Sequence, residues 1–165
     1  MDSKDFVKQA AYGKYLSLFA KNVIRFVDEQ VYLEVAEQGV AQEGNWFVHQ
    51  DIIGELPLFT AISANKEVFL HIASQHAEEE LTEVGLAKAS VCEFLNLTNG
   101  IYLVNMSNWG IELNMKPQGI MENTAVSGES FVVTVNTSKG PFQLILSDQP
   151  ATISIEQKAN SEQPA

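Results

Sequence analysis

The chain has 165 residues, 45% of them hydrophobic and 19% charged, so it is long enough to bury a core and resembles an ordinary globular domain. Its 21 acidic and 10 basic residues give a formal net charge of −11, which argues against nucleic acid or an anionic membrane surface as the main partner. The single cysteine excludes an internal disulfide, and no signal core or membrane-length apolar run is present, so we expect a cytoplasmic protein.

The first expected element is a helix over residues 4 to about 28, because apolar and small residues recur there at spacings of three and four. These residues are Phe6, Ala10, Gly13, Leu16, Ala20, Val23 and Val27. Residues 31–36 could continue the helix, but their valine, tyrosine and leucine content favours a strand. Residues 39–45 are predicted to be a polar connection.

Two strands and a short helix are predicted next. The strands cover 46–56 and 58–63, and the breaks at Gly54 and Pro57 favour an antiparallel pair with a tight or bulged turn. Asn65 is a suitable N-cap for a helix over residues 66 to about 76.

A long helix is predicted from about residue 82 to 107, and shorter elements follow it. Residues 111–116 alternate between apolar and polar, as a half-buried strand does. Residues 117–129 are expected to be a loop, and 131–135 and 142–146 to be the two strands of a hairpin. This order of helices and strands predicts an α+β fold with an antiparallel sheet and helices on one of its faces.

The domain organisation follows from the composition near the C-terminus. From Asp148 onward, glutamine, serine, asparagine, proline and alanine dominate, and only Ile153 and Ile155 are suited to packing. We therefore predict one domain over residues 1–147 and a flexible tail over 148–165.

The long central helix has two distinct sides, because each residue turns it by about 100°. One side is an apolar stripe formed by Val84, Ala87, Val91, Leu95 and Tyr102. The other side carries Glu93 and Asn96, three residues apart and so pointing the same way, among the small residues Gly85, Ala89 and Gly100. Such a strip can be a solvated face, a packing site for a neighbouring helix, or a surface that lets a partner approach closely.

Familiar catalytic motifs are absent from the sequence. It contains no glycine-rich phosphate loop, GxSxG, HExxH or CxxC pattern. His71 and His76 would lie about 140° apart around a helix, so they cannot share a metal ion. Cys92 has no evident histidine partner and is expected to be a packed thiol. We therefore expect no metal or cofactor bound by this chain, and chemistry that relies on groups supplied by a partner.

The central helix also carries a recognisable pattern, Glu93-x-x-Asn96-x-x-x-Gly100. It resembles the signature of the CheC/CheX/FliY family of chemotaxis phosphatases, and is most similar to CheX because only one such motif is present. The segments 58–74 and 110–117 also resemble the family's elements on either side of that helix. The similarity covers roughly residues 46–147 and implies a CheC-like or CheX-like fold.

The resemblance implies a hydrolase that removes the aspartyl phosphate from a response-regulator receiver domain such as CheY, in chemotaxis or two-component signalling. By analogy with the family, Asn96 would orient the attacking water, and Glu93 would pair with a lysine of the receiver. The receiver would supply Mg²⁺, and Gly85, Ala89 and Gly100 would let the two surfaces approach. Family members of the CheX type dimerise through their sheet edges, so the resemblance also implies a homodimer.

Two other hypotheses remain open at this point. The chain can be a CheX-like adaptor that docks on a receiver or another signalling partner without turnover. Alternatively, Glu93 and Asn96 can be buried at a helix or dimer contact, where their role would be structural. A phosphatase assay tests the first alternative, and solvent exposure of the two side chains tests the second.

Overall fold

The computed structural model describes residues 3–28, 32–36, 46–122 and 124–157, which form three α-helices, a short 3₁₀-helix and nine strands. The helices are α1 (Ser3–Phe26), α2 (Lys66–Ala77), α3 (Val84–Asn108) and η1 (Pro150–Thr152). The strands are β1 (Tyr32–Ala36), β2 (Trp46–Gly54), β3 (Leu58–Ala64), β4 (Leu113–Met115), β5 (Gly119–Glu122), β6 (Thr124–Ser127), β7 (Phe131–Thr137), β8 (Gly140–Ser147) and β9 (Ser154–Gln157).

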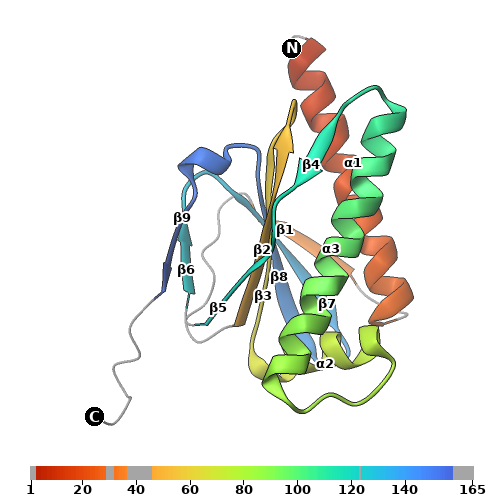
Figure 1. Cartoon of the computed structure of the whole chain (residues 1–165), viewed down its shortest axis with the longest axis vertical. Helices are drawn as coiled ribbons and strands as arrows, with labels where there is room; N and C mark the ends of the chain where they lie inside the picture. Colours follow the sequence, from red (N-terminus) through yellow and green to blue (C-terminus); the bar gives the residue numbers. More distant parts are fainter. Residues whose placement is uncertain (1–2, 29–31, 37–45, 123, 158–165) are drawn as a thin grey trace.

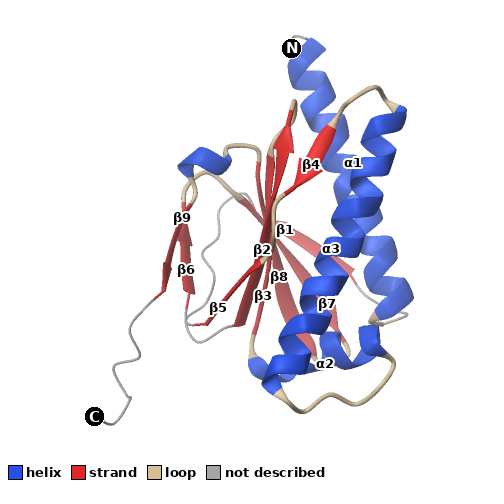
Figure 2. Ribbon diagram, viewed as in Figure 1, coloured by secondary structure: helices blue, strands red, loops and turns tan. Residues whose placement is uncertain are grey.

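The strands form a large antiparallel sheet and a separate two-stranded one. The large sheet has the order β1-β7-β8-β3-β2-β4, and β5 pairs with β2 beside β4. The helices cover one face of this sheet, and the small β6–β9 sheet lies on the other, as Figures 1 and 2 show. The predicted α+β class, with helices on one face of an antiparallel sheet, is confirmed.

The main core fills the space between the helices and the sheet. In Figure 1, α1 and α3 run antiparallel to each other along the sheet. Aromatic rings from both helices meet there: Phe19 packs edge-on against Phe94 and Phe142, at centroid distances of 5.8 and 6.1 Å. These rings are almost completely buried, so α3 is held firmly on the sheet and its outer side is left to solvent.

A second, smaller core lies on the opposite face of the sheet, where the β6–β9 pair covers it. Its buried members are Phe47, Phe59, Ala61, Val126, Val132 and Ile145, with Ile153 and Ile155 packed against them. Two predictions need correction here. The predicted loop 117–129 contains β5 and β6, and residues 150–157 of the predicted flexible tail form η1 and β9. In both places short strands gain their stability from pairing with distant segments, which local composition does not reveal.

Most of the other predicted elements agree with the structure within a few residues. The ambiguous stretch 31–36 contains the strand β1, and Asn65 caps α2 by accepting a hydrogen bond of 2.9 Å from the Val68 amide. The β7–β8 hairpin is tighter than predicted, since Thr137 already pairs with Gly140. The predicted polar connection 39–45 and the tail beyond residue 157 lie outside the described residues.

Gly54 at the end of β2 allows β4 to pair closely beside it. Its φ of +131° is strained for other residues, and a β-carbon there would lie 2.6 Å from the Glu112 carbonyl oxygen. The pairing of Ile52 to Gly54 with Leu113 to Met115 brings the chain that leaves α3 back along β2. Because the chain returns along β2, Lys116 lies close to α3, where its carbonyl oxygen and Asn96 share a hydrogen-bond donor, Gln50.

The His49 side chain is enclosed on the rear face of the sheet by aromatic rings and a glycine. Its ring stacks on Phe59 at 5.9 Å and lies 5.6 Å from Phe47, and a β-carbon at Gly119 would collide with it. Burial lowers the pKa of His49 below its ordinary value of 6.5, although the carboxylate of Asp51 partly opposes this effect.

This environment predicts a pH-dependent stability. Because the folded-state pKa of His49 is lowered, its contribution is fully present above about pH 6.5 and is lost as the pH falls through the folded-state value. We expect wild type to lose stability relative to His49→Gln between pH 7.5 and pH 5, measured by urea unfolding of both proteins. The other titrating groups cancel in this difference. A pH-independent difference would contradict the prediction.

Candidate functional site

The candidate site lies on α3, which is placed by its apolar side. Ala87, Val91 and Leu95 of the predicted stripe are fully buried, and Tyr102 is 2% exposed. Val84 at the first turn is partly buried. The helix begins after Glu83, which makes no side-chain cap, and it ends at Asn108 before Trp109 and Gly110. With the stripe turned toward the sheet, the opposite side of α3 faces solvent.

The predicted site residues share this outward side. Glu93, Gly85 and Ala89 are exposed, and Gly100 is partly exposed. In the monomer Glu93 is therefore not buried against another element, in contrast to the structural alternative raised from the sequence. Asn96 is intermediate and lies where α3 meets the sheet edge.

A glutamine of β2 hydrogen-bonds to the Asn96 side chain from the side of the sheet. The Gln50 Nε2 atom donates to Asn96 Oδ1 at 3.0 Å and also to the Lys116 carbonyl oxygen at 2.8 Å. The Asn96 Nδ2 atom has no hydrogen-bond partner within the described part of the chain, so the amide presents free donor capacity to the outside.

A buried polar network continues from Gln50 into the core. Asn99 Nδ2 donates to Gln50 Oε1 at 2.8 Å and to Thr60 Oγ1 at 3.0 Å. The Tyr15 hydroxyl donates to Asn99 Oδ1 at 2.6 Å. Gln50, Thr60, Asn99 and Tyr15 are each at most 1% exposed, so the network connects the interior directly to Asn96.

Sequence reasoning missed these network residues, although a signal was present. Asn99 falls on the apolar stripe of the helix, and Gln50 occupies an inward position between Val48 and Ile52 of β2. A polar side chain at a core position needs a hydrogen-bond partner, so both amides could have been predicted to be hydrogen-bonded inside the core, although the pattern does not identify the partner of either one.

Large apolar side chains flank Glu93 on the exposed side of α3. Leu86, Leu97 and Val104 are 53%, 38% and 62% exposed. Their spacings of eleven and seven residues place them on one line along the helix, about 20–40° around the helix from Glu93. We call this line the exposed apolar row. These exposed side chains offer hydrophobic area beside the Glu93 carboxylate.

The two glycines on this side have no packing reason within the chain. A β-carbon at Gly100 would have only the Met115 side chain near it, at 4.0 Å, and one at Gly85 only a Glu83 oxygen at 3.8 Å. Gly100, in the interior of α3, costs roughly 1 kcal/mol relative to alanine, whereas Gly85 lies in the first turn and costs less. The cost is therefore not explained by close contacts among the described residues.

Polar contacts at the rim hold the surroundings of Asn96 in place. Lys88 forms an ion pair of 2.9 Å with Glu122 of β5, and Gln118 Nε2 donates to the Cys92 carbonyl oxygen at 3.4 Å. The Cys92 thiol is half-buried, and burial raises its pKa, so it is a poor nucleophile here. This agrees with the prediction of a packed thiol.

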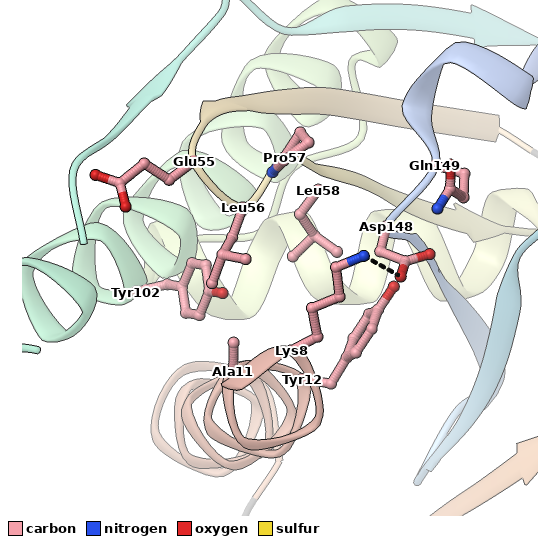
Figure 3. A pocket seen from close by; sticks show the side chains of 10 residues that line it. All are labelled: Lys8, Ala11, Tyr12, Glu55, Leu56, Pro57, Leu58, Tyr102, Asp148 and Gln149. Carbon is pink, nitrogen blue, oxygen red and sulfur yellow. Dashed lines mark ion pairs between the residues drawn. The ribbon is translucent and has the colours of Figure 1, made fainter. Parts of the chain in front are cut away.

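A cavity of about 240 Å³ lies elsewhere, between α1, the β2–β3 turn and the segment after β8 (Figure 3). Lys8 and Asp148 form an ion pair of 4.0 Å at this cavity, and Tyr12 also lines it. Burial, together with the nearby Asp148 carboxylate, raises the pKa of Tyr12. The one residue of α3 among those that line the cavity is Tyr102, which belongs to the buried stripe. None of the predicted site residues lines the cavity. We therefore place the candidate site on the open face of α3.

The described residues offer neither a metal-binding cluster nor a membrane-spanning helix. They contain no group of three or more histidine, cysteine, aspartate or glutamate side chains arranged to hold a metal ion. No helix within residues 3–28, 46–122 and 124–157 is both long and apolar enough to cross a membrane.

No protein-family model matches the sequence, and no curated protein matches it either. Solved structures do share its fold. CheX from Desulfovibrio desulfuricans has a TM-score of 0.69 and 13% identity, covering 84% of this chain and 98% of the other. A CheC-like superfamily protein from Shewanella sp. PV-4 has a TM-score of 0.69 and 12% identity, covering 82% and 95%.

A third neighbour comes from a complex. CheX of Borrelia burgdorferi, solved with CheY, BeF₃ and Mg²⁺, has a TM-score of 0.65 and 15% identity, covering 86% of this chain and 94% of the other. At these identities the likeness concerns the fold. The resemblance to CheX and CheC-like proteins is confirmed at that level, over almost the whole length of each neighbour.

Proposed function

We propose that this chain is a phosphatase of the aspartyl phosphate on a CheY-like receiver domain, acting in chemotaxis or two-component signalling in the cytoplasm. One observation carries the proposal: Glu93 and Asn96 lie together on the open face of α3 in a chain with the CheX fold. One structural neighbour, the CheX of Borrelia burgdorferi, has been solved in complex with CheY, and this indicates the class of partner to test.

The proposed chemistry divides the work between two proteins. The receiver supplies the phosphorylated aspartate, a lysine and the Mg²⁺ that neutralises charge on the phosphoryl group. Asn96 orients a water molecule in line with the scissile bond, for which an amide is sufficient because catalysis here is mostly positioning. Glu93 pairs with the receiver's lysine and fixes the docked geometry.

The surface around the pair suits close docking. Gly85, Ala89 and Gly100 keep the strip low, so that the side chain of Asn96 can reach a recessed phosphoryl group. The exposed apolar row provides hydrophobic area beside Glu93. Together these features explain why helical glycines and exposed aliphatic residues occur on one side of α3.

The proposal is tested by measuring the decay of phosphorylated CheY-like receiver domains, with Mg²⁺, in the presence and absence of this protein. We expect decay to accelerate with catalytic amounts of the chain. Binding of a phosphorylated receiver without any change in its lifetime would support the adaptor alternative. If no receiver from the same organism binds or decays faster, both hypotheses are wrong.

A bulky residue at Ala89 is expected to block docking. Ala89 is exposed, so Ala89→Trp should leave folding intact while lifting the receiver away from Asn96. We predict at least a tenfold rise in the half-saturating receiver concentration, equivalent to about 1.4 kcal/mol. Ser17→Trp on α1, also at an exposed position, is the matched control. Equal effects of the two substitutions would place docking elsewhere.

We further propose a homodimer joined through sheet edges. Within the described residues, β1 and the β4–β5 side form the two edges of the large sheet, and both offer backbone groups for pairing. Measurement of the molar mass in solution tests this directly. A monomer at micromolar concentration would contradict it.

A further inference from the structure

In the hydrogen-bond network beneath Asn96, backbone carbonyl oxygens determine which side-chain atoms donate and which accept. Two of its acceptors are backbone carbonyl oxygens, of Lys116 and of Gln50 itself, and a carbonyl oxygen can only accept. The Lys116 carbonyl therefore requires the NH₂ end of the Gln50 side chain. In the same way, the Gln50 backbone carbonyl accepts a hydrogen bond from the Thr60 hydroxyl, so Thr60 Oγ1 must in turn accept from the NH₂ end of Asn99.

The two backbone carbonyl oxygens determine the orientation of every side-chain amide in the network. Asn99 donates from its nitrogen to Thr60 Oγ1 and to Gln50 Oε1, while its oxygen accepts a hydrogen bond from the Tyr15 hydroxyl. Gln50 then has its oxygen toward Asn99 and its nitrogen toward Lys116 and Asn96. The atom of Asn96 that faces Gln50 must be an acceptor, which is Oδ1.

We infer that Gln50 is a positioning residue that acts through Asn96. It fixes the Asn96 amide with one lone pair of Oδ1 occupied, Nδ2 directed outward and the second lone pair of Oδ1 free. This inference rests on the proposed function and deepens it. The remaining lone pair accepts a hydrogen bond from the attacking water, and the N–H groups of Nδ2 are available to donate to the receiver's phosphoryl oxygens.

Burial makes Gln50 suited to this role. Its side chain is 1% exposed and fully hydrogen-bonded, with both donors and its acceptor engaged. A satisfied buried network is rigid, and rigidity in the support of a catalytic side chain preserves productive geometry. Gln50 touches neither the receiver nor the phosphoryl group in this arrangement.

The test uses Gln50→Met, which keeps the side-chain length and removes the donors. We expect kcat for receiver dephosphorylation to fall about 10–100-fold, with the half-saturating receiver concentration unchanged. Combined with Asn96→Ala, Gln50→Met should cause no further loss of kcat. In the wild type, the ¹⁵N heteronuclear NOE of Asn96 Nδ2 should show a rigid side chain, and in Gln50→Met it should show a mobile one.

The control is Ser90→Ala, which removes another buried hydrogen bond of α3, from Ser90 Oγ to the Ala73 carbonyl oxygen at 2.7 Å. It should leave kcat unchanged. An unchanged kcat in Gln50→Met, a further loss in the Asn96→Ala background, or a mobile Asn96 amide in the wild type would each overturn the inference. If Gln50→Met does not fold, the wild-type NOE remains as the test, and a mobile Asn96 amide overturns the inference.

Failure of the proposed function gives a different result. In that case the wild type accelerates the decay of no phosphorylated receiver, and Gln50 then has no role in dephosphorylation. The NOE comparison still decides the remaining claim, because a rigid wild-type amide that becomes mobile in Gln50→Met supports positioning of Asn96 by Gln50. Equal mobility in the two proteins overturns that claim as well.

Discussion

Asn96→Ala is expected to reduce receiver dephosphorylation by about 10²–10³-fold, which is the usual effect of removing one well-placed polar group. The fold should remain intact, because Asn96 is only partly buried and Gln50 keeps its bond to the Lys116 carbonyl. Single-turnover decay of a phosphorylated receiver, with saturating amounts of this protein, measures the effect on the chemical step. Circular dichroism and urea unfolding verify that the variant is folded.

Glu93→Gln is the informative companion to that variant. If Glu93 pairs with the receiver's lysine, its neutralisation should mainly raise the half-saturating receiver concentration, by about tenfold or 1.4 kcal/mol. The rate at saturation should change much less than in Asn96→Ala. Equal losses of kcat in both variants would contradict the division of roles. An Asn96→Ala variant with wild-type rates would remove Asn96 from the mechanism.

Phe94→Ala should lower the free energy of unfolding by about 3–5 kcal/mol, because it empties a fully buried position where α3 meets α1. The Phe94 ring lies 5.8 Å from that of Phe19 and 5.7 Å from that of His76, so its removal leaves a cavity lined by rings. This loss is a large share of the ~5–15 kcal/mol that stabilises a typical domain. Urea unfolding measures it directly.

The control for Phe94→Ala is Leu97→Ala on the opposite side of the same helix. Leu97 is 38% exposed, so its truncation should change the free energy of unfolding by only about 0.5 kcal/mol. It should instead weaken receiver binding, because Leu97 belongs to the exposed apolar row. Similar unfolding energies for the two variants would mean that α3 is not held on the sheet as described.

The sequence predicted the elements whose patterns are long or well punctuated. The 24-residue α1 and the 25-residue α3 repeat their apolar residues along most of their length, and the strands on either side of Pro57 are separated by a clear break. Glu93 and Asn96 could be placed together because a spacing of three fixes their relative direction on any helix. Their roles remain predictions until the variants above are measured.

What the sequence did not predict depends on partners distant along the chain. Strands β5, β6 and β9 have only four residues each, too few for a clear alternation, and β6 and β9 form because Val126 and Ile155 meet across the pair. Gln50 and Asn99 are 49 residues apart, and nothing local to either one indicates that they share a hydrogen bond.

The attachment of β9 to the rear of the sheet has a consequence for how the chain can be shortened. A protein ending at residue 147 would lose the cover over Phe47 and Phe59, since Ile153 and Ile155 lie beyond that point. The uncovered aromatic surface would favour self-association and could be mistaken for a natural assembly. Any truncation used to study α3 should therefore retain the sequence through Gln157.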